Sequence, residues 1–279
     1  MYMNYNGYRI EQVRTDDAAL RESQALLQLV FEKHADKFSF DYVKWMYAEN
    51  PVGQIVGFNA YADDILAAHY VAMPIYLNIQ GRKTLGLLSL NTVTHPDHRG
   101  MRLFTVLAEQ TYQYAAENGY QFVVGVANAN STHNFLKNLH FNLVGSLTLK
   151  VGFGTFIYPQ RTYTFSHFWD QDTLEWRLRN PSMKNYKNGE IITGPIAVGC
   201  KKLVCHNGAE MVSLPKLRFR PLNLYIGYGA ELRKGFYFSL PKFIKRSPFN
   251  LIFRDLTGGT LPQMTSDNVF FELIDFDVA

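Results

Sequence analysis

A strand, a tight turn, a helix and a second strand follow one another in residues 88–141, and this order limits the possible folds most strongly. Leu88–Thr94 is an apolar, β-branched run that stops just before a proline, which predicts a strand. Residues 95–100 contain a proline and a glycine, as turns do. Apolar residues then recur at helical spacing as far as Gly119, and Phe122–Val126 is a second apolar run. A strand–helix–strand unit of this kind joins parallel strands by a right-handed crossover, so we expect a mixed α/β fold.

The turn of this unit predicts an anion site. A helix that opens at Arg99–Gly100, directly after a strand, offers unpaired backbone N–H groups and the positive end of its dipole. A phosphate-bearing ligand fits such a site, although an ordinary structural unit with a basic helix cap gives the same pattern. After the second strand, Asn130–Ser131 predicts the N-cap of a short helix that ends near Leu139.

These residues carry a resemblance to a known family. Thr94–Gly100 reads THPDHRG, and two leucines follow it at helical spacing, in a segment that ends at Phe141. This segment resembles the acyl-coenzyme A binding core of the GNAT N-acyltransferases. In that family an Arg/Gln-x-x-Gly-x-Gly/Ala loop holds the coenzyme A diphosphate through backbone N–H groups. Here Arg102 and Phe104 stand at the two later small positions, and Arg102 could itself pair with a phosphate.

The resemblance implies that acyl-coenzyme A is the acyl donor. The donor-binding residues that it implies are Thr92, Val93, Thr94, His98, Arg99, Gly100, Met101, Arg102, Leu103, Phe104, Asn128 and Asn130. The pantetheine would lie along Thr92–Thr94 in strand-like pairing. Asn128 and Asn130 could bond its amides, but turn and N-cap chemistry also accounts for asparagines at a strand end.

Acyl transfer to an amine needs a neutral amine, a thioester and stabilisation of the tetrahedral oxyanion. The glutamate and the tyrosine that serve the family as base and acid are replaced by Leu90 and Leu136. His69, on a predicted strand, is the best remaining ionisable candidate, and Asn91 is the second catalytic candidate. A lone histidine is often only a core or surface residue. Placement of the amine against the thioester, with a backbone oxyanion donor near Val93, would then carry most of the catalysis.

The residues before this unit predict a first strand, two helices and three antiparallel strands. The expected strands are Tyr8–Val13, Gly53–Ala60, Ile65–Ala72 and Ile75–Ile79, with a hairpin turn at 62–64. Thr15–Asp17 marks the start of one helix, and Asp41 is expected to cap a second one that ends before Pro51. Trp45, Tyr47 and Asn50 are the predicted acceptor-binding residues, with core packing as the alternative for the two aromatic side chains.

A weak internal repeat suggests a second copy of the same domain. Four features of the first half, Phe38, Asp41, Trp45 and Asn50-Pro51, recur as Phe168, Asp172, Trp176 and Asn180-Pro181. Chance can produce four matches. The interpretation is a GNAT fold at residues 1–155 and a diverged GNAT-like domain on the acceptor side at residues 156–279.

The resemblance extends to an acceptor. Tandem length and the segments quoted above resemble bacterial sugar N-acyltransferases of surface polysaccharide synthesis. These transfer an acetyl or 3-hydroxybutanoyl group to the amine of a nucleotide-linked aminodeoxy sugar, such as a dTDP-3-amino-3,6-dideoxyhexose. Arg218, Arg220, Arg233 and Lys234 are possible partners of the sugar diphosphate, or simply solvated charges. Two alternatives remain open: another amine (peptide, antibiotic or aminoacyl), or a coenzyme A-binding module without catalysis.

Composition excludes several other classes. The net charge of +4 is mild and no Lys/Arg run occurs, so we expect no nucleic-acid partner. Cys200 and Cys205 lack the neighbours of a metal site, and no metal is expected. The N-terminus has no secretion signal and no apolar run is long enough to span a membrane, which predicts a soluble cytoplasmic protein without a membrane partner.

Overall fold

The structure is a computed structural model of the chain. It describes residues 2–153, 156–157, 162–188, 191–197, 200–205, 222–228, 231–232, 236–240 and 247–276. Arg218, Arg220, Arg233 and Lys234 lie outside the described residues.

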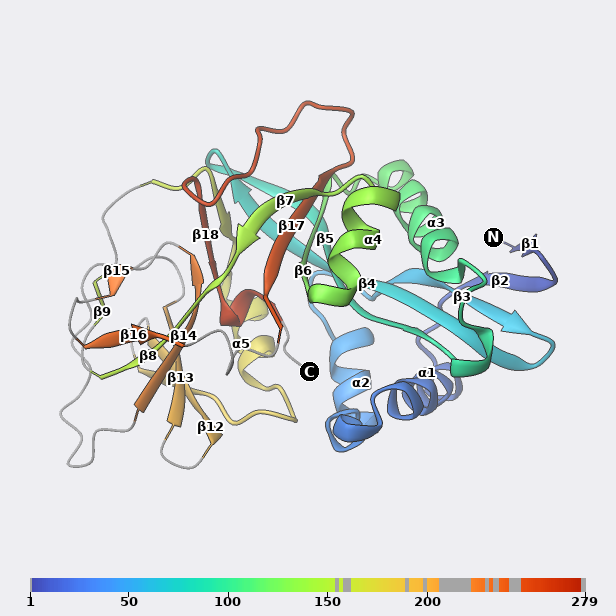
Figure 1. The fold of residues 1–279 in the computed structure, drawn as a ribbon, viewed down its shortest axis with the longest axis horizontal. Helices are drawn as coiled ribbons and strands as arrows, with labels where there is room; N and C mark the ends of the chain where they lie inside the picture. Colours follow the sequence, from blue (N-terminus) through green and yellow to red (C-terminus); the bar gives the residue numbers. More distant parts are fainter. Residues whose placement is uncertain are drawn as a thin grey trace.

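The first part of the chain forms a mixed sheet with helices on both faces (Figure 1). Its strands are β1 (Tyr2–Tyr5), β2 (Tyr8–Gln12), β3 (Val56–Ala62), β4 (Ile65–Ile79), β5 (Arg82–Thr94), β6 (Phe122–Ala127) and β7 (Asn142–Ser146). Strands β1 to β5 pair antiparallel in chain order, whereas β5 and β6 pair parallel. The helices are α1 (Asp17–Val30), α2 (Phe40–Tyr47), α3 (Leu103–Glu117) and α4 (Ala129–Asn138), with the short 3₁₀ turns η1 (Glu32–Lys37) and η2 (Pro96–His98). The predicted mixed α/β fold is confirmed.

Two helices begin at a different cap from the one predicted. The side chain of Ser39 accepts the N–H of Tyr42 and caps α2, while Asp41 lies inside the first turn. Asn128, two residues before the predicted cap, starts α4. Several capping residues stand close together in both segments, and the periodicity does not select among them. The expected start of α1 is confirmed, since Asp16 accepts the N–H of Ala19.

Strand β4 is one long strand where the sequence predicted two, because Pro74 is accommodated within it. On the edge away from β5, β3 pairs with β4 only as far as Ala72, and strand β10 pairs with it only from Leu77 onward. Pro74 therefore lies where no strand needs its missing N–H. Its own carbonyl accepts the side-chain amide of Asn50 at 2.8 Å.

Side chains of β4 alternate between two apolar layers. Val71 and Met73 pack in the layer that includes α1 and α2, and Tyr70 and Ala72 pack in the layer that includes α3 and α4. A strand covered on both faces must be apolar on both, which explains its nearly continuous apolar sequence. The sheet is thus packed on both faces.

Most strands of the second part of the chain continue the same sheet, whereas two short ones pair only with each other. Its elements are β8 (Thr148–Gly152), β9 (Phe156–Ile157), β10 (Phe165–His167), α5 (Gln171–Leu178), β11 (Tyr186–Asn188), β12 (Ile191–Ala197), β13 (Cys200–Cys205), β14 (Leu222–Tyr228), β15 (Glu231–Leu232), β16 (Tyr237–Ser239), β17 (Asn250–Asp255), β18 (Val269–Glu272) and η4 (Leu273–Asp275). Strand β17 lies between β6 and β7 and runs antiparallel to both. The boundary near residue 155 stays a prediction, and by its hydrogen bonds β17 belongs to the sheet of the first part.

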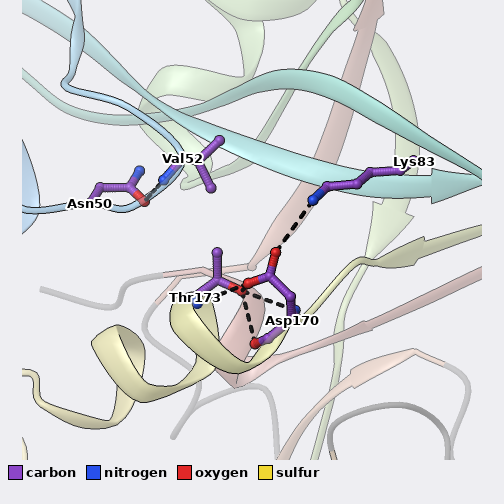
Figure 2. Close-up of polar contacts among 5 residues, drawn as sticks. All are labelled: Asn50, Val52, Lys83, Asp170 and Thr173. Atoms are coloured by element: carbon purple, nitrogen blue, oxygen red, sulfur yellow. Dashed lines mark hydrogen bonds and ion pairs between the residues drawn. The ribbon is translucent and has the colours of Figure 1, made fainter.

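The two helices of the predicted repeat, α2 and α5, contact each other. The indole rings of Trp45 and Trp176 stack with centroids 4.6 Å apart, and each ring N–H donates to the backbone carbonyl of the other tryptophan, at 2.9 and 3.0 Å. Asp170 caps α5 by accepting the N–H of Thr173 and also accepts from Lys83 of β5 at 3.3 Å (Figure 2). Reciprocal contacts are expected where two copies of one element face each other, but the duplication stays a prediction.

Candidate active site

Strands β5 and β6 separate before β5 ends. Their parallel pairing covers only Leu87–Ser89 on β5. Gly125 of β6 is the last residue paired with β5, and a Cβ there would lie 3.3 Å from the Ser89 Cβ. Beyond this point Leu90–Thr94 pairs with β4 alone, and among the described residues no strand covers its other edge. A free strand edge can pair with an extended ligand.

A bulge lies in this free part of β5. The register between β4 and β5 shifts between His69 and Val71, opposite Asn91 and Thr92. Asn91 has φ of +48°, in the left-handed region, which asparagine tolerates better than most residues. The bulge turns the half-buried Asn91 side chain away from the regular alternation of the strand.

A cavity of about 260 Å³ opens where α3 begins. It is lined by Thr94, His98, Arg99, Gly100, Met101, Arg102, Leu103, Phe104, Thr105, Asn134 and Asn138. Gly100 (φ +82°) and Arg102 (φ +59°) bend the chain into the helix. The bond from Val106 N–H to the Arg102 carbonyl, at 3.2 Å, is the first of the helix, so the N–H groups just before Val106 have no partner within it. This geometry suits a phosphate.

Two histidines stabilise the turn that leads to the cavity. The ring Nδ1 of His98 lies 3.0 Å from the hydroxyl of Tyr8 on β2. The Nδ1 of His95 accepts the backbone N–H of Asp97 at 3.3 Å. The first contact holds the turn against the sheet, and the second lies within the turn itself.

Most of the predicted donor-binding residues lie together. Thr94 and residues 98–104 line the cavity, and Thr92 and Val93 precede it on the free edge of β5. Asn128 and Asn130 are exposed at the start of α4, where the Asn128 side chain accepts the N–H groups of Asn130 and Ser131. Neither lines the cavity, and the capping alternative accounts for Asn128. Whether any of these residues binds the donor stays a prediction.

Sequence reasoning missed Asn134 and Asn138, which line the cavity from α4. The Asn138 amide donates to the Asn134 side-chain oxygen at 2.8 Å. Their spacing of four places both on one face of a helix, and this spacing was the available signal. They offer amide groups opposite the start of α3.

His69 is fully buried and both of its ring nitrogens have partners. Nδ1 lies 2.7 Å from the side-chain oxygen of Asn59, and Nε2 lies 3.0 Å from the hydroxyl of Tyr47. Burial lowers the pKa of His69 to about 3, and it raises the pKa of Tyr47 well above its usual value. His69 is therefore neutral at physiological pH, and no nitrogen is available to take a proton from an amine. The predicted role as general base stays untested, and this geometry favours a positioning role instead.

Replacing His69 with glutamine should make the protein less sensitive to acid. The unfolded chain binds a proton at this residue below pH 6.5, whereas the folded chain does so only near pH 3, because burial lowers the pKa. Acid in this range thus lowers the free energy of unfolding, by up to about 1.4 kcal/mol per pH unit. Urea unfolding at pH 7 and pH 4.5 should show a smaller loss in His69→Gln than in the parent. His167 has its pKa lowered to about 3, and Asp275 has its pKa raised to about 7. Both residues are present in both proteins, so their contributions to the loss cancel in the comparison. Equal losses would show that His69 is not the source.

The predicted acceptor residues Trp45, Tyr47 and Asn50 are buried in the structure. Trp45 stacks on Trp176, and Asn50 bonds the Pro74 carbonyl and accepts the N–H of Val52 (Figure 2). One edge of Trp45 also lines a surface groove of about 510 Å³ with Asp41, Lys44, Glu49, Trp176, Arg179 and Pro181. These internal contacts account for the burial of all three side chains, and their role in binding an acceptor stays a prediction.

Comparison with known proteins gives a family match for part of the chain and a similar fold for most of it. Residues 12–141 match the acetyltransferase (GNAT) domain family. A probable N-acyltransferase from Enterococcus faecalis V583 has a similar structure, with a TM-score of 0.59 and 10% identity over 89% of this chain and 73% of that one. A GCN5-related N-acetyltransferase from Anabaena variabilis has a TM-score of 0.59 and 11% identity, over 90% of this chain and 74% of that one. Eis1 from Mycobacterium abscessus has a TM-score of 0.57 and 9% identity, over 88% of this chain and 73% of that one. At such identities the likeness shows the fold alone. No curated protein sequence matches the chain.

In the part of the chain that the structure describes, no helix combines the length and the apolar character needed to cross a membrane.

Proposed function

We propose that this chain transfers an acyl group from acyl-coenzyme A to an amine, because residues 12–141 match the acetyltransferase (GNAT) domain family. The cavity at the start of α3 is the proposed donor site. The observation that carries the proposal is the set of unpartnered N–H groups after the left-handed residues Gly100 and Arg102, in a cavity with Arg99. Three phosphates of coenzyme A match this positive, donor-rich surface.

Each part of the donor has a matching surface. The diphosphate would meet the backbone N–H groups that begin α3, with Arg99 and Arg102 as cationic partners. The pantetheine would pair with the free edge of β5 at Thr92–Thr94 and so carry the thioester toward the bulge at Asn91. The amine would attack the thioester carbonyl, and the C–S bond would break to release coenzyme A thiolate.

Placement of the acceptor amine against the thioester is the proposed source of most of the rate acceleration. Leu90 and Leu136 cannot transfer protons, and both nitrogens of His69 are hydrogen-bonded in the core. The ammonium proton of the acceptor would pass to water, and the thiolate would be protonated by water. A backbone N–H near Val93–Thr94 would stabilise the oxyanion.

For the acceptor we propose the amine of a nucleotide-linked aminodeoxy sugar, in surface polysaccharide synthesis, in the cytoplasm. The support is the sequence resemblance to tandem sugar N-acyltransferases, while a peptide, antibiotic or aminoacyl amine is the alternative. The acyl group would be acetyl or 3-hydroxybutanoyl.

Thiol release from acetyl-coenzyme A and from 3-hydroxybutanoyl-coenzyme A tests the proposal. The assay uses dTDP-3-amino-3,6-dideoxyhexose, an aminoglycoside, an aminoacyl ester and a lysine peptide as acceptors. We expect calorimetric binding of coenzyme A and release that depends on the amino sugar nucleotide. Release with another amine only would reject the acceptor but keep the reaction class. Binding without release on any amine would reject the catalytic proposal, and no binding would reject the donor site.

A further inference from the structure

Three hydrogen-bonded hydroxyl groups form a chain that ends where β5 and β6 separate. The Tyr112 hydroxyl on α3 bonds the Tyr70 hydroxyl on β4, and the Tyr70 hydroxyl lies 2.9 Å from Ser89 Oγ on β5. Tyr70 and Tyr112 are buried, whereas Ser89 is half-buried. The chain of hydroxyls therefore runs from the core of the protein to a side chain that is partly exposed.

The supply of protons and acceptors fixes the direction of both hydrogen bonds. Each hydroxyl carries one proton to donate. Among the described residues, the Tyr112 hydroxyl has no hydrogen-bond partner except Tyr70. If Tyr70 donated to Tyr112, the Tyr112 proton would be buried without an acceptor, which is costly. If Tyr70 only accepted, its own proton would be buried in the same way. Tyr112 therefore donates to Tyr70, Tyr70 donates to Ser89, and the Ser89 proton is left for a further partner.

Ser89 marks the inner end of the free edge of β5. It is the last residue of β5 that pairs with β6, and the free edge covers Leu90–Thr94. An extended ligand that pairs with this edge must stop where β6 takes its place, next to Ser89. The sulfur of coenzyme A follows the last amide of the pantetheine by a short methylene arm. A donor that pairs at Thr92–Thr94 therefore carries its sulfur toward Ser89.

The hydroxyl chain and the cavity of the proposed donor site lie on the same face of the sheet. Tyr70 and Tyr112 pack in the layer that includes α3 and α4, and both helices also line the cavity. The ring of Phe104, which lines the cavity, meets the ring of Tyr70 edge-on, with centroids 5.8 Å apart. Opposite Ser89, Gly125 of β6 has no side chain that could cover the hydroxyl. A donor bound in the cavity thus reaches Ser89 without crossing the sheet.

We propose that the Ser89 hydroxyl donates a hydrogen bond to the sulfur of coenzyme A while the C–S bond of the tetrahedral intermediate breaks. This inference rests on the proposed acyl transfer. The electron pair of the broken bond moves to the sulfur, which becomes a thiolate. A donor that already points at the developing charge lowers the barrier. Ser89 is then a catalytic residue, and Tyr70 and Tyr112 are positioning residues that fix the direction of its proton.

The chain orients a proton but does not give it away. If Ser89 passed its proton to the sulfur and took another from Tyr70, the negative charge would end on a buried tyrosine. Burial raises the pKa of Tyr70 to about 12 and that of Tyr112 well above its usual value. Both lie far above the usual pKa of a thiol, about 8.5. Ser89 therefore keeps its proton, and the thiolate takes a proton from water.

The thiol of bound coenzyme A tests this contact without any turnover. A hydrogen bond to the thiolate lowers the pKa of the bound thiol. We expect this pKa to be about one unit higher in Ser89→Ala than in the parent, a tenfold change in acidity. A pH titration of the thiolate ultraviolet absorbance at saturating coenzyme A measures it, and the complex with desulfo-coenzyme A serves as the blank. Equal thiol pKa values in Ser89→Ala and the parent would overturn the proposal.

Two further variants separate this contact from a general loss of buried hydroxyls. Thr111→Val removes a buried hydroxyl that bonds the Leu107 carbonyl within α3, outside the chain, and should leave the thiol pKa unchanged. Tyr70→Phe keeps the Ser89 hydroxyl but frees its direction, so it should raise the thiol pKa by less than Ser89→Ala does. An unchanged thiol pKa in Tyr70→Phe would overturn the positioning role, and a raised one in Thr111→Val would overturn the specific contact.

Kinetics test the consequence for the reaction. Ser89→Ala should lower kcat about tenfold to a hundredfold, and Thr111→Val should leave kcat within about twofold. A fall of kcat in Ser89→Ala without a change in thiol pKa would place the hydroxyl on another atom and overturn the proposal. If the parent binds coenzyme A but acylates no amine, the proposed function fails, whereas the thiol pKa still decides the contact with Ser89. If coenzyme A does not bind, the donor site and this inference are both rejected.

Discussion

Gly100→Asp is expected to weaken coenzyme A binding by at least about a hundredfold, equivalent to about 3 kcal/mol. The new carboxylate would stand beside the N–H groups that begin α3, where it repels the diphosphate and competes for the same donors. A Cβ at Gly100 meets no atom within 4 Å, so the side chain would project into open space and the fold need not move. The loss should therefore appear in binding calorimetry while the melting temperature changes little.

Backbone strain is the competing explanation, and a second glycine controls for it. Gly81, in the β4–β5 hairpin, has the same φ of +82° and the same open surroundings, but it does not line the cavity. Gly81→Asp should carry the same strain and the same charge and leave coenzyme A affinity unchanged. Gly100→Ala should lower the free energy of unfolding only by the backbone strain, roughly 1 kcal/mol. If Gly100→Asp bound coenzyme A like the parent, the donor site would have to lie elsewhere.

The segment that carries the proposed donor site could be predicted because its signals are local. Strand, turn and helix between residues 88 and 127 follow from apolar spacing, from a proline and from a glycine. The helix α3 and the strand β6 lie where these signals place them, whereas β5 ends at the predicted Thr94 but begins earlier, at Arg82. The cavity then follows from chain order alone, because the turn after a strand and the start of the next helix are neighbours in sequence.

Contacts between distant residues could not be predicted in this way. Strand β17 reaches its place between β6 and β7 more than a hundred residues later in the chain, and no periodicity encodes that pairing. The sequence singled out His69, Tyr47 and Asn91 separately, as base, acceptor wall and second catalytic candidate. Only the pairing of β3 with β4 and the packing of α2 show that Asn59, His69 and Tyr47 touch, and Asn59 gave no signal beyond its place in an apolar strand.

Trp176→Ala should lower the free energy of unfolding by about 3–5 kcal/mol. The indole is 5% exposed, stacks on Trp45 and donates to its backbone carbonyl, so truncation leaves a cavity and an unpaired carbonyl between α2 and α5. For a chain of this size the melting temperature should fall by on the order of 10 °C. Thermal unfolding by circular dichroism measures the shift, and urea unfolding measures the free energy.

The matched variant Trp176→Phe separates packing from hydrogen bonding. It keeps an aromatic ring against Trp45 but cannot donate, so it should cost only about 1–2 kcal/mol. The shape of the transition carries further information, because α2 and α5 lie on opposite sides of the predicted boundary near residue 155. One cooperative transition that shifts as a whole means that the stack joins both parts into a single unit, as the insertion of β17 also leads us to expect. Two separate transitions would instead support two independent domains, if only the transition of the later part of the chain shifted. A melting temperature within about 2 °C of the parent would contradict the proposed role of the tryptophan pair.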